Sequence, residues 1–226
     1  MMRILNLLCT FLFVVTSLTA HAAVVIQVDI DGLDDGVLTY SPNFSFGGDT
    51  TSASQSAAST AVGLTGGDSI FGGNGVVSPD TYVYSYTPGT DGNNYTPAAG
   101  TALNNDGDVS TGVLAGGTAV YNVYATWPFS SNVSGGLTSY TLTDGASNLF
   151  SVSVDQVNTG NEWVFLGAAT LDQSKTYQLI QQAGANTFVS MRAAGVLFDA
   201  KAVPEPSGFL VAVLGGTILM VRRRRA

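Results

Sequence analysis

Short runs of β-branched and aromatic residues, separated by Gly, Asn, Asp and Ser, recur throughout residues 23–203. No stretch there repeats its apolar residues with the 3.6-residue period of an amphipathic helix. In the run AVYNVYATW at residues 119–127, successive side chains would instead face opposite sides of a strand. Many short strands divided by turn residues are typical of sandwiches and jelly rolls. The sequence therefore predicts an all-β domain, a β-sandwich of jelly-roll-like arrangement.

We expect strands at residues 24–29, 36–40, 81–86, 119–127, 138–143, 149–154, 162–170, 176–181 and 193–199. Asp144-Gly145 predicts a hairpin turn, and Thr159-Gly160-Asn161 predicts a second turn. Residues 41–75 are rich in Ser, Thr, Gly and Ala, so we expect a mostly surface segment with weak strand content. The 226 residues contain no sign of a second core, which indicates a single domain over residues 23–202.

Residues 1–22 have the pattern of a secretory signal peptide. Arg3 is followed by an apolar run, and Ala20-His21-Ala22 is a small-x-small cleavage site, so signal peptidase would cut before Ala23. An uncleaved anchor helix is the alternative. Cys9 and His21 are the only Cys and His of the chain. Once residues 1–22 are removed, disulfides, Cys or His catalysis, and zinc or copper sites with nitrogen or sulfur ligands are excluded.

The C-terminal residues form three consecutive segments. Pro204-Glu205-Pro206 precede an apolar stretch at residues 207–221, and Arg222-Arg223-Arg224-Arg225 follow it. The apolar stretch predicts a single membrane helix, and the four arginines favour a cytoplasmic end and stop transfer. This tripartite tail resembles the PEP-CTERM sorting signal. The resemblance implies processing by the membrane peptidase exosortase in a Gram-negative bacterium that makes extracellular polysaccharide, whereas an ordinary anchor is the alternative.

The charge of residues 23–203 limits the partners that the domain can bind. These residues carry three cations, Lys175, Arg192 and Lys201, against fifteen acidic residues, a net charge of −12. So little positive charge excludes nucleic acid, whose binding requires neutralisation of phosphates. Divalent cations, basic partners or neutral sugars suit such a surface better than anionic polymers.

The second half of the domain resembles the golvesin C-terminal-like module of bacterial secreted enzymes, including xanthan lyases. The resemblance covers residues 119–199 and implies a carbohydrate-binding β-sandwich. It departs from the family at Ala194, where an acidic residue is usual. The matching blocks are Tyr121-x-Val123-x-Ala125-x-Trp127, Tyr140-x-Leu142, Val152-x-Val154-x-Gln156, Trp163-Val164-Phe165-Leu166-Gly167 and Val196-Leu197-Phe198.

Aromatic residues are the candidates for stacking against sugar rings. Tyr82, Tyr84 and Tyr86 share one face of an expected strand, and that face is either exposed or half-buried. Tyr95 and Trp127 complete the candidate set, although Trp127 also suits core packing, as Trp163 and Tyr121 do.

Acidic clusters offer oxygen ligands for calcium. The candidate ligands are Asp29, Asp31, Asp34 and Asp35 in one cluster and Asp106 and Asp108 in another. Neither cluster has EF-hand spacing, and the alternative is turn formation, in which Asp and Asn hydrogen-bond nearby backbone. No other cofactor is expected.

The sequence contains no catalytic motif, and Glu162 is the only Glu of residues 23–203. We therefore expect an exported, non-enzymatic protein. It would be anchored transiently in the inner membrane and then delivered to the cell surface or extracellular matrix, where it binds or packs with polysaccharide. One alternative is a structural matrix protein or adhesin without a glycan site. The other is a polysaccharide-active enzyme, which would need a close carboxylate pair with one raised pKa.

Overall fold

The computed structural model describes residues 23–48, 52–57, 59–73, 80–91, 117–131, 133, 137–183 and 190–200. The first strands are β1 (Ala23–Gln27), β2 (Phe44–Gly47), β3 (Ser52–Ala57), β4 (Asp68–Gly73), β5 (Thr81–Tyr86) and β6 (Thr118–Thr126). They are followed by β7 (Leu137–Thr143), β8 (Asn148–Asp155), β9 (Val164–Asp172), β10 (Tyr177–Ala183), β11 (Ser190–Ala193) and β12 (Gly195–Ala200). Within these ranges the chain is all β, and no helix has the length and apolar content required to cross a membrane.

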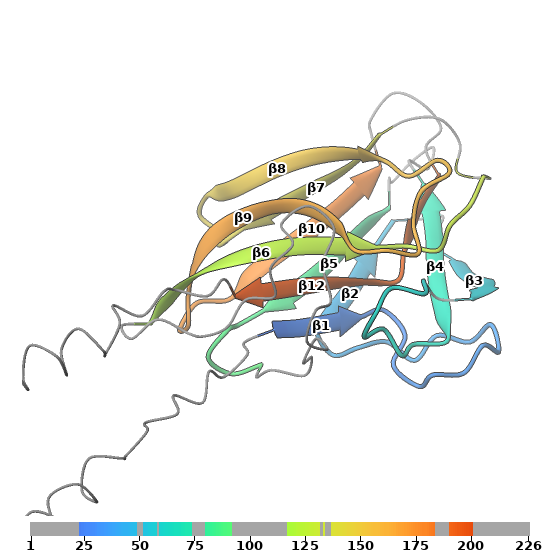
Figure 1. Cartoon of the computed structure of the whole chain (residues 1–226), viewed down its shortest axis with the longest axis horizontal. Helices are drawn as coiled ribbons and strands as arrows, with labels where there is room; N and C mark the ends of the chain where they lie inside the picture. Colours follow the sequence, from blue (N-terminus) through green and yellow to red (C-terminus); the bar gives the residue numbers. More distant parts are fainter. Residues whose placement is uncertain are drawn as a thin grey trace, which may run out of the picture.

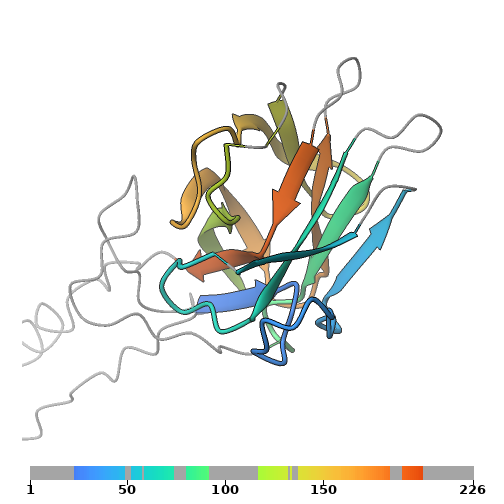
Figure 2. The same cartoon turned by 90° about the vertical axis from the view of Figure 1, so that its right-hand side faces the viewer.

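The strands form three antiparallel sheets (Figures 1 and 2). A four-stranded sheet has the order β1-β12-β6-β9, and a five-stranded sheet has the order β2-β5-β10-β7-β8. These two sheets face each other as a sandwich, and a three-stranded sheet of order β11-β4-β3 lies at one end. The predicted all-β sandwich is therefore confirmed for the described residues.

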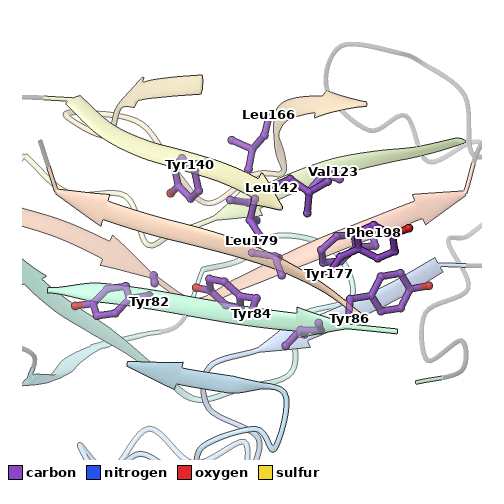
Figure 3. Packing of buried hydrophobic residues seen from close by; sticks show 14 of the residues in the cluster. Tyr82, Tyr84, Tyr86, Val123, Tyr140, Leu142, Leu166, Tyr177, Leu179 and Phe198 are labelled. Atoms are coloured by element: carbon purple, nitrogen blue, oxygen red, sulfur yellow. The ribbon is translucent and has the colours of Figure 1, made fainter. Parts of the chain in front are cut away.

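The core lies between the two large sheets and is rich in tyrosine (Figure 3). Tyr86 of β5 stacks on Phe198 of β12, with ring centroids 4.6 Å apart, and meets Tyr121 of β6 edge-on at 5.8 Å. Trp127 lies just beyond β6, and its ring stacks on that of Tyr140 in β7. Because these aromatic pairs join opposite sheets, they bury apolar area and fix the spacing of the sandwich.

The outer face of the four-stranded sheet has a smaller core of its own. Tyr124 and Leu197 are buried there, beneath a cover that includes Ala61 and Trp163. The Trp163 indole N–H donates to the Val62 carbonyl at 2.8 Å, which fixes this cover to the end of the β8–β9 connection. Both cores lie within residues 23–200, and the single domain over residues 23–202 stays a prediction.

Buried amides attach β11 to the sandwich. The side chains of Gln156 and Gln181 both donate to the Arg192 carbonyl, at 3.0 and 2.9 Å, and the Arg192 N–H donates to Gln156 Oε1 at 2.8 Å. Gln156 also donates to the Tyr140 hydroxyl. A buried polar network that is satisfied in this way determines the position of β11.

Eight of the expected strands are confirmed with small shifts of their ends, and residues 193–199 contain the end of β11 and most of β12. The one remaining expected strand, at residues 36–40, is wrong. Only an isolated bridge joins Tyr40 to Asp29, and the intervening residues form a loop. Residues 41–75 contain three strands, β2 to β4, and Ile70 is fully buried, so this segment contributes to the fold more than its composition indicates. The signal peptide, the C-terminal motif and the membrane helix lie outside the described residues.

Candidate functional site

The loop between Asp29 and Tyr40 is held by carboxylates that accept backbone hydrogen bonds. The buried Asp29 accepts the Thr39 N–H at 2.9 Å through Oδ1, and the N–H groups of Gly67 and Asp68 through Oδ2. Asp31 accepts the Leu33 N–H and the Thr39 hydroxyl. This network gives the ten-residue loop a defined conformation, and Tyr40 follows at its end.

The tip of the same loop is fixed through Asp68 on β4. Its Oδ2 accepts the N–H groups of Asp35 and Gly36, at 3.2 and 3.0 Å. The Asp35 carboxylate in turn accepts the Val37 N–H at 2.9 Å. These carboxylates therefore act in the turn chemistry that the sequence offered as the alternative to calcium binding.

Tyr40, Phe44 and Phe46 form an aromatic cluster, here called the aromatic edge, at the open side of strand β2. The Tyr40 and Phe46 ring centroids lie 5.1 Å apart, and Phe44 lies 5.8 Å from Tyr40. Phe44 is buried, whereas Tyr40 and Phe46 remain 39% and 43% exposed. Partial burial raises the pKa of Tyr40, so its hydroxyl is neutral at physiological pH. Two neighbouring rings are thus presented to solvent, Phe46 from β2 and Tyr40 from the end of the preceding loop.

The aromatic edge continues into the core. Phe44 and Phe46 pair with Tyr84 and Tyr82 across β2 and β5, and the Phe44 ring lies 5.0 Å from that of Tyr84. Directly opposed residues of neighbouring antiparallel strands point to the same face. The row of rings is therefore covered at Tyr82 and Tyr84 and becomes accessible only at the last strand, which Figure 2 shows at the margin of the sheet.

Burial contradicts the predicted stacking role for four of the five candidate residues. Tyr82, Tyr84, Tyr86 and Trp127 have no exposed surface, so their rings cannot stack against a sugar. Figure 3 shows the three tyrosines along β5 among the other core side chains. Burial raises the pKa values of Tyr84 and Tyr86 far above the usual range of a phenol, so both remain neutral. Tyr95 lies outside the described residues.

The described residues contain no group of three or more His, Cys, Asp or Glu side chains that could hold a metal ion. Asp29, Asp31, Asp34 and Asp35 all belong to that part of the chain, whereas Asp106 and Asp108 do not. Calcium binding therefore stays a prediction.

Asp68 is the described carboxyl group whose pKa is raised. Burial is the main cause, and the charges of Asp34 and Asp29 add to it, while hydrogen bonds from Gly36 and Asp35 oppose it. A raised pKa beside other carboxylates is a feature of many acid–base sites. Asp68 is nevertheless only 1% exposed, and Oδ2 is occupied by two backbone N–H groups, so a substrate has no access to it here.

Two other exposed rings lie on separate elements. Phe129, which follows β6, is 56% exposed. Phe71 of β4 is 37% exposed, and the Arg192 guanidinium lies over its ring at 5.8 Å from the centroid. Because neither ring has an exposed aromatic neighbour among the described ring contacts, neither offers the paired surface of Tyr40 and Phe46.

Phe44 and Phe46 were missed in the sequence because residues 41–75 were expected to form little strand, and Tyr40 was placed in an expected strand at residues 36–40. A signal for them is present in Tyr40-Ser41-Pro42-Asn43-Phe44-Ser45-Phe46. Two aromatic residues separated by one serine have the period of a strand, and Pro42 after a serine is typical of the turn before it.

No protein-family model matches the chain, and no curated protein matches it. Among solved structures, the chain is similar to a Paenibacillus xanthan lyase determined at 2.6 Å resolution, with 16% sequence identity and a TM-score of 0.49. The likeness covers 81% of this chain and 13% of the lyase chain. The chain thus spans a small part of the length of that structure.

Proposed function

We propose that this chain is an exported, non-enzymatic surface or matrix protein whose sandwich binds extracellular polysaccharide at the aromatic edge. The observation that carries the proposal is the exposed pair of rings, Tyr40 and Phe46, with centroids 5.1 Å apart and next to Phe44, which is buried in the core. Flat apolar rings of this kind suit the faces of sugar rings, and their rigid attachment lowers the entropy cost of binding.

The charges around the aromatic edge favour a neutral polysaccharide. Asp31, Asp34 and Asp35 are exposed on the loop that leads to Tyr40. Hydrogen bonds, first from the Thr39 hydroxyl and then from the Leu33 N–H, lower the pKa of Asp31 and keep this carboxylate ionised. An anionic polymer would meet like charges here, so it would need bridging calcium or high salt to bind.

The delivery of the domain rests on the two terminal segments of the sequence. Signal peptidase would release residues 1–22, and exosortase would act at Pro204-Glu205-Pro206 while the helix at residues 207–221 holds the chain in the inner membrane. The four arginines would keep the C-terminus in the cytoplasm. The product would be a sandwich released to the cell surface or matrix.

Binding is tested by electrophoresis of residues 23–202 in native gels that contain a neutral β-glucan or alginate. Tyr40→Ala and Phe46→Ala should each weaken retardation by the glucan about tenfold, equivalent to about 1.4 kcal/mol. Phe129→Ala is the matched control, because it removes an exposed ring from another part of the surface. Equal retardation of the wild type and both edge variants would overturn the proposed site.

Processing is tested by the intact mass of the protein released from a Gram-negative host that carries exosortase. The proposal expects a chain that begins at Ala23 and ends near Pro204–Pro206, and it expects Pro204→Ala to accumulate in the membrane. A released chain that keeps its four arginines would contradict sorting by exosortase.

A structural matrix protein or adhesin is the second candidate, and one observation favours it. Ile30, Leu33 and Val37 are 48%, 56% and 62% exposed on the loop next to the aromatic edge. Exposed apolar side chains gathered on one loop are typical of protein contacts. If Leu33→Ser abolishes attachment to the matrix while retardation by glucan is unchanged, this second function is the better one.

A further inference from the structure

Strand β8 (Asn148–Asp155) forms one margin of the five-stranded sheet, and among the described strands it pairs with β7 alone. Figure 1 shows β8 at the outside of the sandwich. The β7–β8 ladder has a register shift between Leu142 and Thr143 and is regular from Phe150 to Asp155. The backbone groups on the outer side of β8 are thus a row of donors and acceptors that no described strand pairs with.

Proteins usually protect such an edge with Lys, Pro, a bulge or a very short strand. Strand β8 has the sequence NLFSVSVD, in which the only charge is Asp155 at the last position. By contrast, the opposite margin of the sheet is β2, which has four residues, and β9 is paired through a register shift in its interior. Among the described residues, the regular part of the β8 edge, from Phe150 to Asp155, therefore has none of these protections.

We propose that β8 pairs antiparallel with β8 of a second copy of this chain, about a two-fold axis close to Val152. Directly opposed residues of an antiparallel pair share a face. This axis places Phe150 opposite Val154 of the second copy, on the side packed against the core, and places Ser151 opposite Ser153 on the exposed side. The strand is thus complementary to itself.

The scarcity of charge on β8 favours a second copy over a strongly charged partner at this edge. A basic or acidic partner would find one carboxylate among eight residues, so charge supplies little of its recognition. In the self-paired register, Asp155 lies opposite the apolar Leu149, which keeps the two copies of this carboxylate apart. The −12 net charge of residues 23–203 opposes association at long range, so added salt should strengthen the dimer.

The dimer would join the two five-stranded sheets into one and leave both copies of β2 at its far margins. Two aromatic edges on one rigid particle could hold two segments of polysaccharide, and the second contact would gain from the high effective concentration that the first creates. The pairing itself does not depend on polysaccharide binding, so failure of either proposal leaves the other to be judged separately.

Sedimentation velocity of residues 23–202 over micromolar to millimolar concentrations tests the association directly. We expect a monomer–dimer equilibrium that shifts toward the dimer as salt is raised. The double variant Ser151→Lys/Ser153→Lys places like charges opposite each other and should be monomeric, whereas Gln178→Lys adds a charge to an exposed position of the interior strand β10 and should still dimerise. A wild type that stays monomeric at every concentration would overturn the proposal.

Cross-linking locates the interface independently of those variants. Residues 23–202 contain no cysteine, so a single Ser151→Cys substitution creates one reactive position. A short bis-maleimide should link two Ser151→Cys copies and leave Gln178→Cys monomeric. Equal cross-linking at both positions, or cross-linking at neither despite a dimer in sedimentation, would place the interface elsewhere.

Discussion

The ring of Phe150 on β8 lies directly over the backbone of Gly167 on β9. A Cβ atom added at position 167 would lie 3.1 Å from the nearest carbon of that ring. The contact joins the margins of the two large sheets, because β8 and β9 belong to different sheets. It brings them together at the side of the sandwich where β8 ends the five-stranded sheet, and a Cβ atom at position 167 would require the ring to shift by a few tenths of an ångström.

Gly167→Val should therefore destabilise the domain by about 1–3 kcal/mol, because the added side chain must displace a ring packed between two sheets. Urea unfolding followed by tryptophan fluorescence measures the change. The exposed neighbour Ala168 provides the control, since Ala168→Val should change stability by less than about 0.5 kcal/mol. Equal effects of both variants would show that the Phe150 contact is not tight.

Two buried tyrosines should respond in opposite directions to loss of the hydroxyl. The Tyr84 hydroxyl is buried and has no hydrogen-bond partner among the described residues, whereas the Tyr140 hydroxyl accepts from Gln156 Nε2 at 2.9 Å. Tyr84→Phe should be neutral or stabilise the fold by up to about 1 kcal/mol, and Tyr140→Phe should cost about 1 kcal/mol. Thermal unfolding of the two variants measures these changes in stability. A Tyr140→Phe variant more stable than the wild type would contradict the prediction.

Asp29 should control both the stability of its loop and the presentation of Tyr40. Asp29→Ala leaves the N–H groups of Thr39, Gly67 and Asp68 without their acceptor, which should cost about 3 kcal/mol. Amide hydrogen exchange should speed up across residues 30–40. Asp35→Ala loses a single exposed hydrogen bond to Val37, and its cost should stay below about 1 kcal/mol.

The Asp68 carboxyl group should make the domain less stable as the pH rises. Burial raises its folded-state pKa above the unfolded value, so its contribution is complete below the unfolded pKa and is lost as the pH rises through the folded pKa. Asp68→Asn keeps an acceptor oxygen for Asp35 and Gly36 without the charge. The variant should match the wild type at acid pH and be more stable than the wild type at pH 7, as measured by urea midpoints over a pH series.

Asp144 in the β7–β8 turn provides a control, because its contribution to stability should change with pH in the opposite direction. Backbone hydrogen bonds from Ser147 and Ala146 lower its pKa, so its contribution is present above the unfolded pKa and is lost as the pH falls through the folded pKa. Asp144→Asn should therefore be less stable than the wild type at neutral pH and equal to it in acid. An advantage of Asp68→Asn that stays constant with pH would contradict the assignment.

Strands β7, β8 and β10 were predictable because their side chains alternate between a more buried and a more exposed face. In β10, for example, Tyr177, Leu179 and Gln181 are buried and Gln178 and Gln182 are exposed. Such alternation is a local property of the sequence. The segment at residues 36–40 alternates as well, but Asp31 and Asp35 fold it into turns instead.

Which face of β5 is buried could not be predicted. Tyr82, Tyr84 and Tyr86 alternate with Thr81, Val83 and Ser85, and tyrosine occurs both in cores and at binding surfaces. The packing of the four-stranded sheet against this face decides the question, and that contact joins strands far apart in the sequence. The accessible rings are therefore Phe46 of β2 and its neighbour Tyr40, where the row of aromatic residues reaches the last strand of the sheet.

Strand β4 was missed because its residues, DSIFGG, lack the usual signs of a strand. The position of β4 depends on close contact between its glycines and Asp80, which the strand propensities of its residues do not predict. A Cβ atom at Gly72 would lie 1.9 Å from a carboxylate oxygen of Asp80, so only glycine allows β4 to pass this buried acid. The Gly73 N–H donates to the same carboxylate at 2.9 Å.

Strands β1 and β12 run antiparallel side by side, and Ala23 at the start of one is paired with Asp199 near the end of the other (Figure 1). A mechanical load applied between these two ends would pull the strands apart at right angles to their length. Hydrogen bonds would then break one after another from Ala23 inward, rather than all together as in shear. A domain stretched in this way yields at low force by peeling off β1, while the tyrosine core between the sheets stays closed.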